Sequence, residues 1–294
     1  MQEQIGFIGL GVMGTPMALN LARSGAPIAV WSRSKDRYAE LGAAGACTVE
    51  KVADLFAQCR VVILMLADDD AIDTVLGRHT ADFSVRVREH VIVNMGTTSP
   101  SYSRALATEI ESAAGHYVEA PVSGSRKPAE AGQLVVMLAG APEDVQEVRN
   151  IVKPLWRESI ICGAVPSALT MKLAVNLYLI TMVTGLAEAT HFAQRHGMDL
   201  AQFTSVLNNG QMASDISRVK LDKLATQDFT VQAAITDVLK NSRLVAESAR
   251  SAGLASPLLD VCHTLYSETV ALGYGSSDMA AVIRAIEWRT ETVQ

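Results

Sequence analysis

Aromatic residues, charges and cysteines are all scarce in this sequence, and each shortage narrows what the chain can be. Aromatic residues account for 5% and charged residues for 19% of the 294 residues, whereas hydrophobic residues account for 49%. This balance excludes a disordered chain and indicates a large core of aliphatic side chains. At a typical size of about 150 residues per domain, the length corresponds to about two domains.

The four cysteines, Cys47, Cys59, Cys162 and Cys262, are scattered and form no C-x-x-C pair. This spacing favours free thiols in a reducing cytoplasm over disulfides or a metal site. An excess of positive charge is also lacking, because the net charge is −6. We therefore expect a cytoplasmic protein that holds no metal and binds no nucleic acid.

A hydrophobic run long enough to span a membrane is lacking too. The apolar segment Leu173–Ala187 falls short of the roughly 20 residues that a bilayer core requires, and Lys172, Asn176 and Glu188 lie in or beside it. The polar start of the chain, Met1–Gln4, has no basic region or cleavage site, so we expect no export signal. A buried helix of a soluble protein fits the apolar segment better than a membrane span.

In the first half of the chain, short apolar runs alternate with amphipathic stretches. The predicted strands are residues 5–9, 28–31, 61–66, 91–95, 117–119 and 134–139, and the predicted helices are 13–24, 35–42, 51–57, 101–114 and 142–156. Such alternation is typical of a parallel sheet with helices on both faces.

Near Gly163 this alternation stops, and from Ser167 onward the pattern is helical. Breaks fall at Gly197, at 208–210, at Gly253 and at 273–275. We therefore predict an α/β domain over residues 1–163, followed by an all-helical domain over 164–294 for substrate binding and dimerisation.

The helix predicted from about Ser167 to His196, which joins the two domains, is apolar on nearly all faces. A helix of this kind has to be buried, and one small domain can hardly enclose it alone. We therefore expect it to pack against a second copy of the chain, in a homodimer or a larger homo-oligomer.

A glycine-rich motif follows the first predicted strand. Gly9, Gly11 and Gly14 form G-x-G-x-x-G, with Val12 and Met13 inside it, where that strand ends and a helix begins. The first glycine permits a tight turn, the second lets a pyrophosphate approach the backbone, and the third allows close packing of helix and strand. The motif predicts a Rossmann domain that binds a dinucleotide, the alternative being a glycine-rich turn without a ligand.

The end of the second predicted strand indicates which dinucleotide is bound. An NAD site has Asp or Glu there, about 20 residues after the glycine motif, to hold the ribose 2′-hydroxyl. Here the strand is followed by Ser32, Arg33 and Ser34, with no acid before Asp36. Because Arg33 can fork onto a 2′-phosphate, with the two serines as further donors, NADP(H) is preferred over NAD(H). A solvated arginine in a loop is the alternative.

Three further segments follow predicted strands, where open sheets form their crevices. Met65 and Leu66 end the third strand, and Thr97 lies in N-M-G-T-T-S-P, which can line a nicotinamide ribose or simply start a helix. Residues 123–125 of E-A-P-V-S-G-S offer backbone N–H groups and two hydroxyls that can bind a carboxylate, unless they form a mere loop.

Lys172 and Asn176 lie four residues apart on the long apolar helix and therefore share a face. Burial lowers the pKa of a lysine toward values that are useful for proton transfer. The alternative is a lysine whose stem packs along apolar surface while its ammonium reaches solvent.

Together these segments resemble the β-hydroxyacid dehydrogenase family, which includes 3-hydroxyisobutyrate dehydrogenases and glyoxylate/succinic semialdehyde reductases. The shared segments are G-L-G-V-M-G-x-x-M-A-x-N-L, E-A-P-V-S-G-S, M-K-L-x-x-N and D-V-L-K-N, and they follow one another in the family's order. The stretch S-G-S-R-K-P-A-E-A-G-Q-L is most similar to the glyoxylate/succinic semialdehyde reductase branch, which prefers NADPH.

The resemblance implies an NADPH-dependent reductase of small carboxylated aldehydes that yields hydroxyacids. In that family Lys172 would protonate the carbonyl oxygen and Asn176 would orient the substrate. The residues that would hold the substrate carboxylate are Ser123, Gly124 and Ser125. Thr97 and Lys240 would contact the cofactor.

The chain also departs from the family pattern. The departures are Pro166, Ala168, Gly96, Ala233 and Asn241, which indicate a reshaped pocket. Three other readings are an imine reductase of the same architecture, a 6-phosphogluconate dehydrogenase, and a non-catalytic NADP(H)-binding module. The first usually has Asp or Tyr at the position of Lys172, the second needs a larger helical domain, and the third lacks the lysine.

Overall fold

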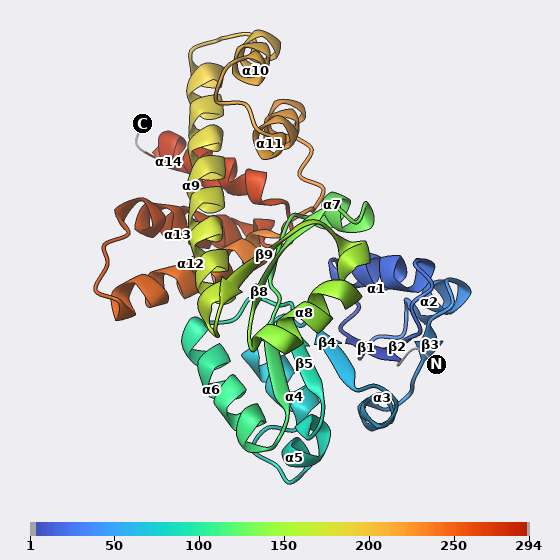
Figure 1. Ribbon diagram of the computed structural model, residues 1–294. Helices are drawn as coiled ribbons and strands as arrows, with labels where there is room; N and C mark the ends of the chain where they lie inside the picture. The colour runs from blue at the N-terminus through green and yellow to red at the C-terminus, as the bar shows by residue number, and fades with distance from the viewer. Residues whose placement is uncertain (1–3, 293–294) are drawn as a thin grey trace. The chain divides into compact units, whose positions relative to one another are not determined.

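The computed structural model describes residues 4–292, and the chain divides into two compact units, Met1–Lys172 and Leu173–Gln294 (Figure 1). Residues 1–3, which contribute to the expectation that no export signal is present, lie outside the described residues. Each unit has a hydrophobic core of its own.

The first unit is built on one sheet whose strands run in the order β3-β2-β1-β4-β5-β6-β8-β7, with β9 also paired to β8. The strands are β1 (Ile5–Ile8), β2 (Ile28–Trp31), β3 (Cys47–Thr48), β4 (Val61–Leu64), β5 (Val91–Asn94), β6 (His116–Glu119), β7 (Val122–Ser123), β8 (Leu134–Ala139) and β9 (Trp156–Gly163). The six runs predicted as strands are strands, whereas β3, β7 and β9 were not predicted.

The prediction of a parallel sheet is wrong at one edge. Strands β1 to β6 pair in parallel, but β8 runs antiparallel to both β6 and β7. Between β7 and β8 the chain has only the five-residue helix α7 (Arg126–Glu130), and so short a connection returns the chain antiparallel instead of making a parallel crossover. Strand β9 then pairs in parallel with β8, and its largely exposed residues explain why it has no hydrophobic pattern.

Helices cover both faces of this sheet. They are α1 (Gly14–Arg23), α2 (Tyr38–Ala43), α3 (Val52–Gln58), α4 (Asp69–Leu76), α5 (Asp82–Val87), α6 (Pro100–Ser112) and α8 (Pro142–Ile151), with the 3-10 turn η1 (Lys153–Leu155). The predicted helix over 142–156 therefore ends early, because Pro154 interrupts it and β9 begins at Trp156. Helices α4 and α5 were not predicted.

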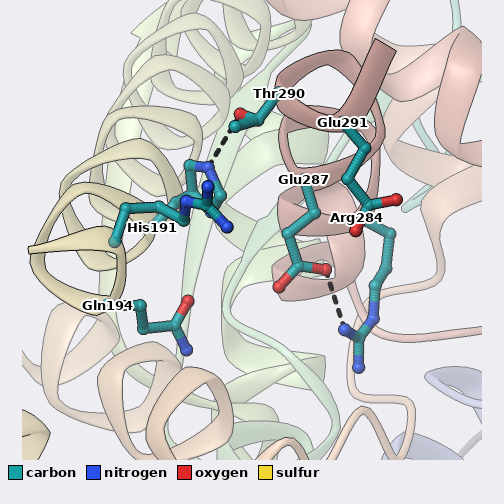
Figure 2. A pocket seen from close by; sticks show the side chains of 7 residues that line it. His191, Gln194, Arg284, Glu287, Thr290 and Glu291 are labelled. Carbon is teal, nitrogen blue, oxygen red and sulfur yellow. Dashed lines mark hydrogen bonds and ion pairs between the residues drawn. The ribbon is translucent and has the colours of Figure 1, made fainter. Parts of the chain in front are cut away.

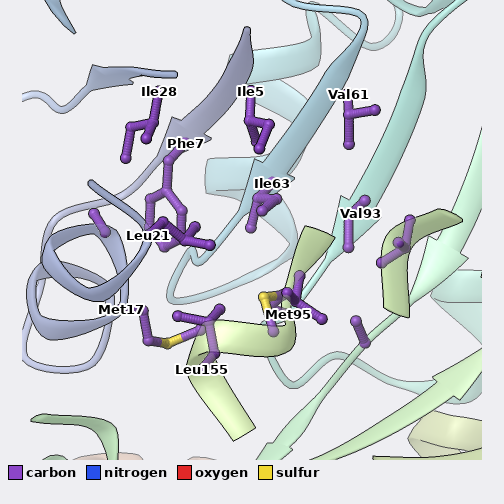
Figure 3. Close-up of a cluster of buried hydrophobic side chains, with 14 of the residues drawn as sticks. Ile5, Phe7, Met17, Leu21, Ile28, Val61, Ile63, Val93, Met95 and Leu155 are labelled. Carbon is purple, nitrogen blue, oxygen red and sulfur yellow. The ribbon is translucent and has the colours of Figure 1, made fainter. Parts of the chain in front are cut away.

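The two faces of the sheet bury alternate residues of each strand. Phe7 and Ile63 point into a core that α1 and α8 complete (Figure 3), and their neighbours Ile8 and Leu64 point into a second core under α3, α4 and α6. Because successive side chains of a strand point to opposite faces, strands that are buried on both sides read as continuous apolar runs.

The second unit is helical in the part that the structure describes. After α9 (Ser167–Arg195), which begins in the first unit, come α10 (Leu200–Asn209), α11 (Asp215–Thr226), α12 (Ile235–Ser251), α13 (Pro257–Thr269), η2 (Val270–Tyr274), η3 (Met279–Val282) and α14 (Ile283–Thr292). Helices α9, α10 and α12 end at predicted breaks, whereas the break between α11 and α12 was not predicted. The only strand-type contact among the described residues of this unit is the isolated bridge between Ala234 and Asp278.

The 29-residue helix α9 is long and apolar enough to cross a membrane, contrary to the estimate from the 15-residue segment. Its residues Leu173, Ile180, Val183 and Ala187 nevertheless recur at helical spacing and belong to the core of the second unit. A core helix of a soluble protein has the same composition. Only 33% of its most apolar stretch is buried within the chain, so the expected burial is incomplete.

Candidate active site

The glycine-rich loop has the geometry of a phosphate cradle. Gly9 has a φ of +101°, and a Cβ there would lie 2.2 Å from the carbonyl oxygen of Met65. A Cβ on Gly14, where α1 begins, would lie 1.9 Å from the carbonyl oxygen of Gly9. At Gly11 a Cβ would meet no atom within 4 Å, so the open side of the loop can admit a ligand. The tight turn at Gly9, the open approach at Gly11 and the close contact at Gly14 therefore match the roles of the three glycines in a dinucleotide site.

The segment after β2 carries the residues predicted to choose the cofactor. Arg33 and Ser34 are exposed and Ser32 is half-buried, with its backbone N–H donating to the hydroxyl of Tyr38 at 3.1 Å. Within residues 4–292 no hydrogen bond or ion pair holds the guanidinium of Arg33. Its side chain can therefore reach a ligand without breaking a contact inside the protein.

Two further predicted segments meet the glycine loop at the carboxyl ends of neighbouring strands. The N–H of Met65 donates to Ile8 at 2.8 Å as the chain leaves β4, and Leu66 follows. After β5, a Cβ at Gly96 would lie 2.8 Å from the carbonyl oxygen of Leu66, so a side chain fits poorly there. Thr97 is half-buried beside it. These segments and the glycine loop lie at the same end of the sheet, where the strands reach their carboxyl ends, because β1, β4 and β5 are adjacent and parallel.

The helix-start reading of the segment after Thr97 is confirmed. Ser99 caps α6 by accepting a hydrogen bond from the N–H of Tyr102 at 3.1 Å, and Pro100 occupies the first turn. The cap and a ribose-lining role are compatible, since Thr97 lies before the cap.

The segment that was predicted to hold a carboxylate is anchored by the antiparallel edge of the sheet. Ser123 ends β7 opposite Val135. Gly124 has a φ of +133°, and a Cβ there would lie 2.7 Å from the side chain of Leu134 and 3.2 Å from that of Pro128. Ser125 then precedes α7. The turn leaves the two serines partly accessible, so backbone and hydroxyl donors remain available to an anion.

Lys172 and Asn176 occupy one face of α9, a single turn apart. Burial lowers the pKa of Lys172 to about 8, although its side chain keeps some access to solvent. Asn176 is 3% exposed, and its Nδ2 has no hydrogen-bond partner among the described residues. A buried donor without a partner is costly, and this Nδ2 group is available to donate to a bound ligand.

Lys240 lies in the second unit, on α12, half-buried. Its positive charge opposes a rise in the pKa of Asp237 that is caused mainly by burial. The structure describes its place only within that unit. Its predicted contact with the cofactor stays a prediction, as do the roles of the other site residues.

The second unit also contains a pocket of about 310 Å³ between the end of α9 and α14 (Figure 2). Its lining residues are His191, Gln194, Arg195, Arg284, Glu287, Thr290 and Glu291. His191 bonds to Thr290 at 2.8 Å and Arg284 pairs with Glu287, so several of these polar groups satisfy one another. The pocket contains no predicted site residue and lacks the apolar lining of a typical small-molecule site.

One buried carboxylate was given no role in the sequence analysis. Glu119, the last residue of β6, is fully buried and accepts hydrogen bonds from Ser103 and from the first turn of α9. Burial raises its pKa, and the bonds that it accepts oppose the rise. A carboxylate at the end of an apolar strand is the signal in the sequence, but its partners are remote along the chain.

Two protein families account for nearly the whole sequence. Residues 4–163 match the NAD binding domain of 6-phosphogluconate dehydrogenase, and residues 167–286 match the family described as NAD-binding of NADP-dependent 3-hydroxyisobutyrate dehydrogenase.

Among similar proteins, the chloroplastic glyoxylate/succinic semialdehyde reductase 2 of Arabidopsis thaliana is 29% identical over 96% of this chain and 79% of its own length. The 2-hydroxy-3-oxopropionate reductase of Escherichia coli is 28% identical over 97% of each chain. A crystal structure of 3-hydroxyisobutyrate dehydrogenase from Salmonella typhimurium superposes with a TM-score of 0.87 at 22% identity, covering 96% of this chain and 99% of that one.

Proposed function

This chain belongs to the 3-hydroxyisobutyrate dehydrogenase-like family of NAD(P)-dependent oxidoreductases acting on CH–OH groups, and from that premise we propose that it reduces small carboxylated aldehydes to hydroxyacids with NADPH. Glyoxylate and succinic semialdehyde are the proposed substrates. They are the compounds in the name of the Arabidopsis relative. The observation that carries the proposal is the pair formed by Lys172 and the unpartnered amide of Asn176 on one face of α9.

Lys172 is proposed to donate the proton. With a pKa of about 8 it is mostly an ammonium at pH 7, yet it releases its proton more readily than an ordinary lysine. An ammonium beside the carbonyl oxygen would stabilise the negative charge that develops there during reduction and then protonate it. Asn176 would hold the substrate with its free Nδ2 donor.

Two other elements would complete the site. The donors at 123–125 would bind the substrate carboxylate and so orient the aldehyde. The glycine loop, Thr97 and Lys240 would hold the dinucleotide, whose 2′-phosphate Arg33 would contact. When bound, the reduced nicotinamide supplies a hydride to the carbonyl carbon. The open approach at Gly11 and the unpaired guanidinium of Arg33 support this fit.

The molecule is proposed to act as a homodimer that forms through α9. Met171, Tyr178 and Phe192 are exposed, and together with Gly185 they recur every seven residues along one face of this helix. Seven residues are close to two helical turns, so the four positions form a stripe that a second copy of α9 can cover. Large apolar side chains aligned in this way are typical of an interface.

The cytoplasm is the proposed location. All four cysteines are free thiols, which is usual in a reducing compartment. The chloroplast named for the Arabidopsis relative, another reducing compartment, is the alternative.

The function is tested by following NADPH oxidation with glyoxylate, three semialdehydes (succinic, methylmalonate and tartronate) and a cyclic imine. We expect turnover of at least one carboxylated aldehyde. Lys172→Ala should lower kcat by roughly 10²- to 10⁴-fold, the usual contribution of general acid catalysis, and should change the Kd for NADPH only a few-fold. Lys153→Ala, which removes an exposed lysine from η1, serves as the control and should leave both values unchanged.

Near-normal turnover by Lys172→Ala would remove this residue from the mechanism. Turnover of the imine alone would replace the carbonyl substrate by an imine. NADPH binding without turnover of any compound would favour a non-catalytic module, and a rise in Tm with NADPH would detect that binding.

A further inference from the structure

A carboxylate from the sheet caps the helix that carries Lys172. The Oε2 atom of Glu119 accepts hydrogen bonds from the N–H groups of Ala168 at 3.0 Å and Leu169 at 3.1 Å, in the first turn of α9. These N–H groups have no partner within the helix, and the helix dipole favours a negative charge beside them. Lys172 follows Ala168 by four residues, so it lies one turn beyond the capped turn on the same face of the helix.

The other oxygen of Glu119 ends a chain of buried polar side chains. Asn94 donates from Nδ2 to the hydroxyl of Tyr117 at 3.2 Å, Tyr117 bonds to Ser103 Oγ at 3.0 Å, and Ser103 donates to Glu119 Oε1 at 2.5 Å. All four side chains are at most 3% exposed. The hydroxyls of Tyr117 and Ser103 thus each accept one hydrogen bond and donate the next, and the chain ends in the carboxylate.

The same chain of hydrogen bonds holds the loop after β5. Asn94 Oδ1 accepts from the N–H of Gly96 at 3.0 Å, and its Nδ2 lies 3.4 Å from Thr98 Oγ1. Thr97 lies between these two anchored residues. One buried network therefore connects the loop that carries Thr97 with the helix that carries Lys172.

Burying a carboxylate and three polar side chains is expensive unless every group is paired, and an apolar core would be stable without them. The buried network makes hydrogen bonds at both ends: Asn94 bonds to the loop that carries Thr97, and Glu119 bonds to the first turn of α9. The capping bonds span 49 and 50 residues of sequence, so they fix the first turn of α9 to the end of β6.

We propose that Glu119 is a positioning residue. Through Ser103, Tyr117 and Asn94 it holds the first turn of α9 against the loop after β5 that carries Thr97, and it thereby orients Lys172. The inference rests on the proposed function, in which Lys172 is the proton donor. Glu119 is fully buried and both of its carboxylate oxygens accept hydrogen bonds from protein groups, so in this proposal it acts through the helix. Loss of the cap should therefore reduce kcat, whereas NADPH binding should persist, because Asn94 keeps its own bonds to Gly96 and Thr98 on either side of Thr97.

The test compares Glu119→Leu with Glu119→Gln. Leucine removes both capping bonds, and we expect kcat to fall at least tenfold while the KM for NADPH stays within threefold. Glutamine keeps an oxygen that accepts from both N–H groups, so we expect kcat within threefold of the wild type. Amide hydrogen exchange of residues 167–172 should accelerate in the leucine variant and not in the glutamine variant, a readout that needs no substrate.

The matched control is Glu109→Leu. Glu109 lies on α6 in the same unit and accepts two hydrogen bonds from Arg78, at 2.8 and 2.6 Å, and among the described residues no hydrogen bond joins it to α9 or to Asn94. This variant should lower Tm and leave kcat within twofold of the wild type. If Glu119→Leu does not fold, Ser103→Ala decides, with an expected threefold or larger fall in kcat at unchanged KM.

Three results would overturn the inference: an unchanged kcat in Glu119→Leu, equal losses in the leucine and glutamine variants, or an unchanged kcat in Ser103→Ala. Failure of the proposed function is a separate result, because it would appear as turnover that survives Lys172→Ala. Unchanged hydrogen exchange in Glu119→Leu would refute the cap itself, even with no substrate known.

Discussion

Single residues decide which ligand the first unit can recognise. Gly9 and Gly14 permit the loop because a side chain at either position would overlap a carbonyl oxygen, and Gly11 leaves the approach open. We propose that the charge beyond β2 distinguishes between NADP(H) and NAD(H). Arg33 supplies a planar cation in the position where an acid would favour the free ribose hydroxyl.

Arg33→Ala should weaken NADPH binding by about 10- to 100-fold, the usual contribution of a hydrogen bond to a charged group. Binding of NADH should change less than threefold, because NADH has no 2′-phosphate for the guanidinium to contact. Fluorescence titration with both cofactors measures the two Kd values. Arg37→Ala, an exposed arginine paired with Glu40, is the control and should leave both unchanged. Equal losses for the two cofactors would refute the assignment.

At the scale of elements, a buried ion pair holds the second unit together. Lys220 on α11 donates to Asp278 at 2.7 Å, and the two side chains are 1% and 0% exposed. Asp278 also accepts from the N–H groups of Gln232 and Ala233 at 3.0 and 3.2 Å. Since this carboxylate holds the loop before α12, it connects three elements of the helical unit.

Lys220→Met should lower the free energy of unfolding by roughly 3–5 kcal/mol, because it leaves the Asp278 carboxylate buried without its cation. Urea denaturation measures the change. Arg243→Met breaks the exposed pair with Glu247 on α12 of the same unit and should cost less than about 1 kcal/mol. Similar losses in the two variants would contradict the importance of burial.

At the scale of the whole molecule, α9 has more apolar surface than one chain covers. Tyr178 is 68% and Phe192 58% exposed on the stripe of exposed positions, although Leu173 and Ile180 on the opposite face are in the core. Helix α10, which follows, has no buried residue. A second copy would remove this surface from water.

Light scattering of the wild type should therefore give twice the mass of one chain. Tyr178→Asp should give the mass of one chain, because an unpaired charge is too costly to bury in an apolar interface. Val85→Asp changes a residue of α5 that is 74% exposed and should remain dimeric. A monomeric wild type, or a dimer that survives Tyr178→Asp, would show that the stripe has another role.

Much of the architecture could be predicted because its causes are local. Apolar runs such as 61–64 become buried strands, breaks such as Gly197 end helices, and the spacing of Lys172 and Asn176 places them on one face. The glycine loop was predicted for the same reason, since its sterics involve neighbouring strands of one βαβ unit. Short or polar elements such as β3, α5 and β9 have too little hydrophobic pattern to be recognised.

The sequence by itself determined the α/β unit, the helical unit, the dinucleotide motif and the family, because each depends on residue types within a few positions of one another. Only the tertiary structure decided that β8 runs antiparallel at the sheet edge and that Nδ2 of Asn176 is buried with no hydrogen-bond partner in residues 4–292. It also decided that Glu119 caps the helix of Lys172. That contact joins residues 49 positions apart, and no local pattern specifies which buried donors a carboxylate will meet once the sheet and helix are packed.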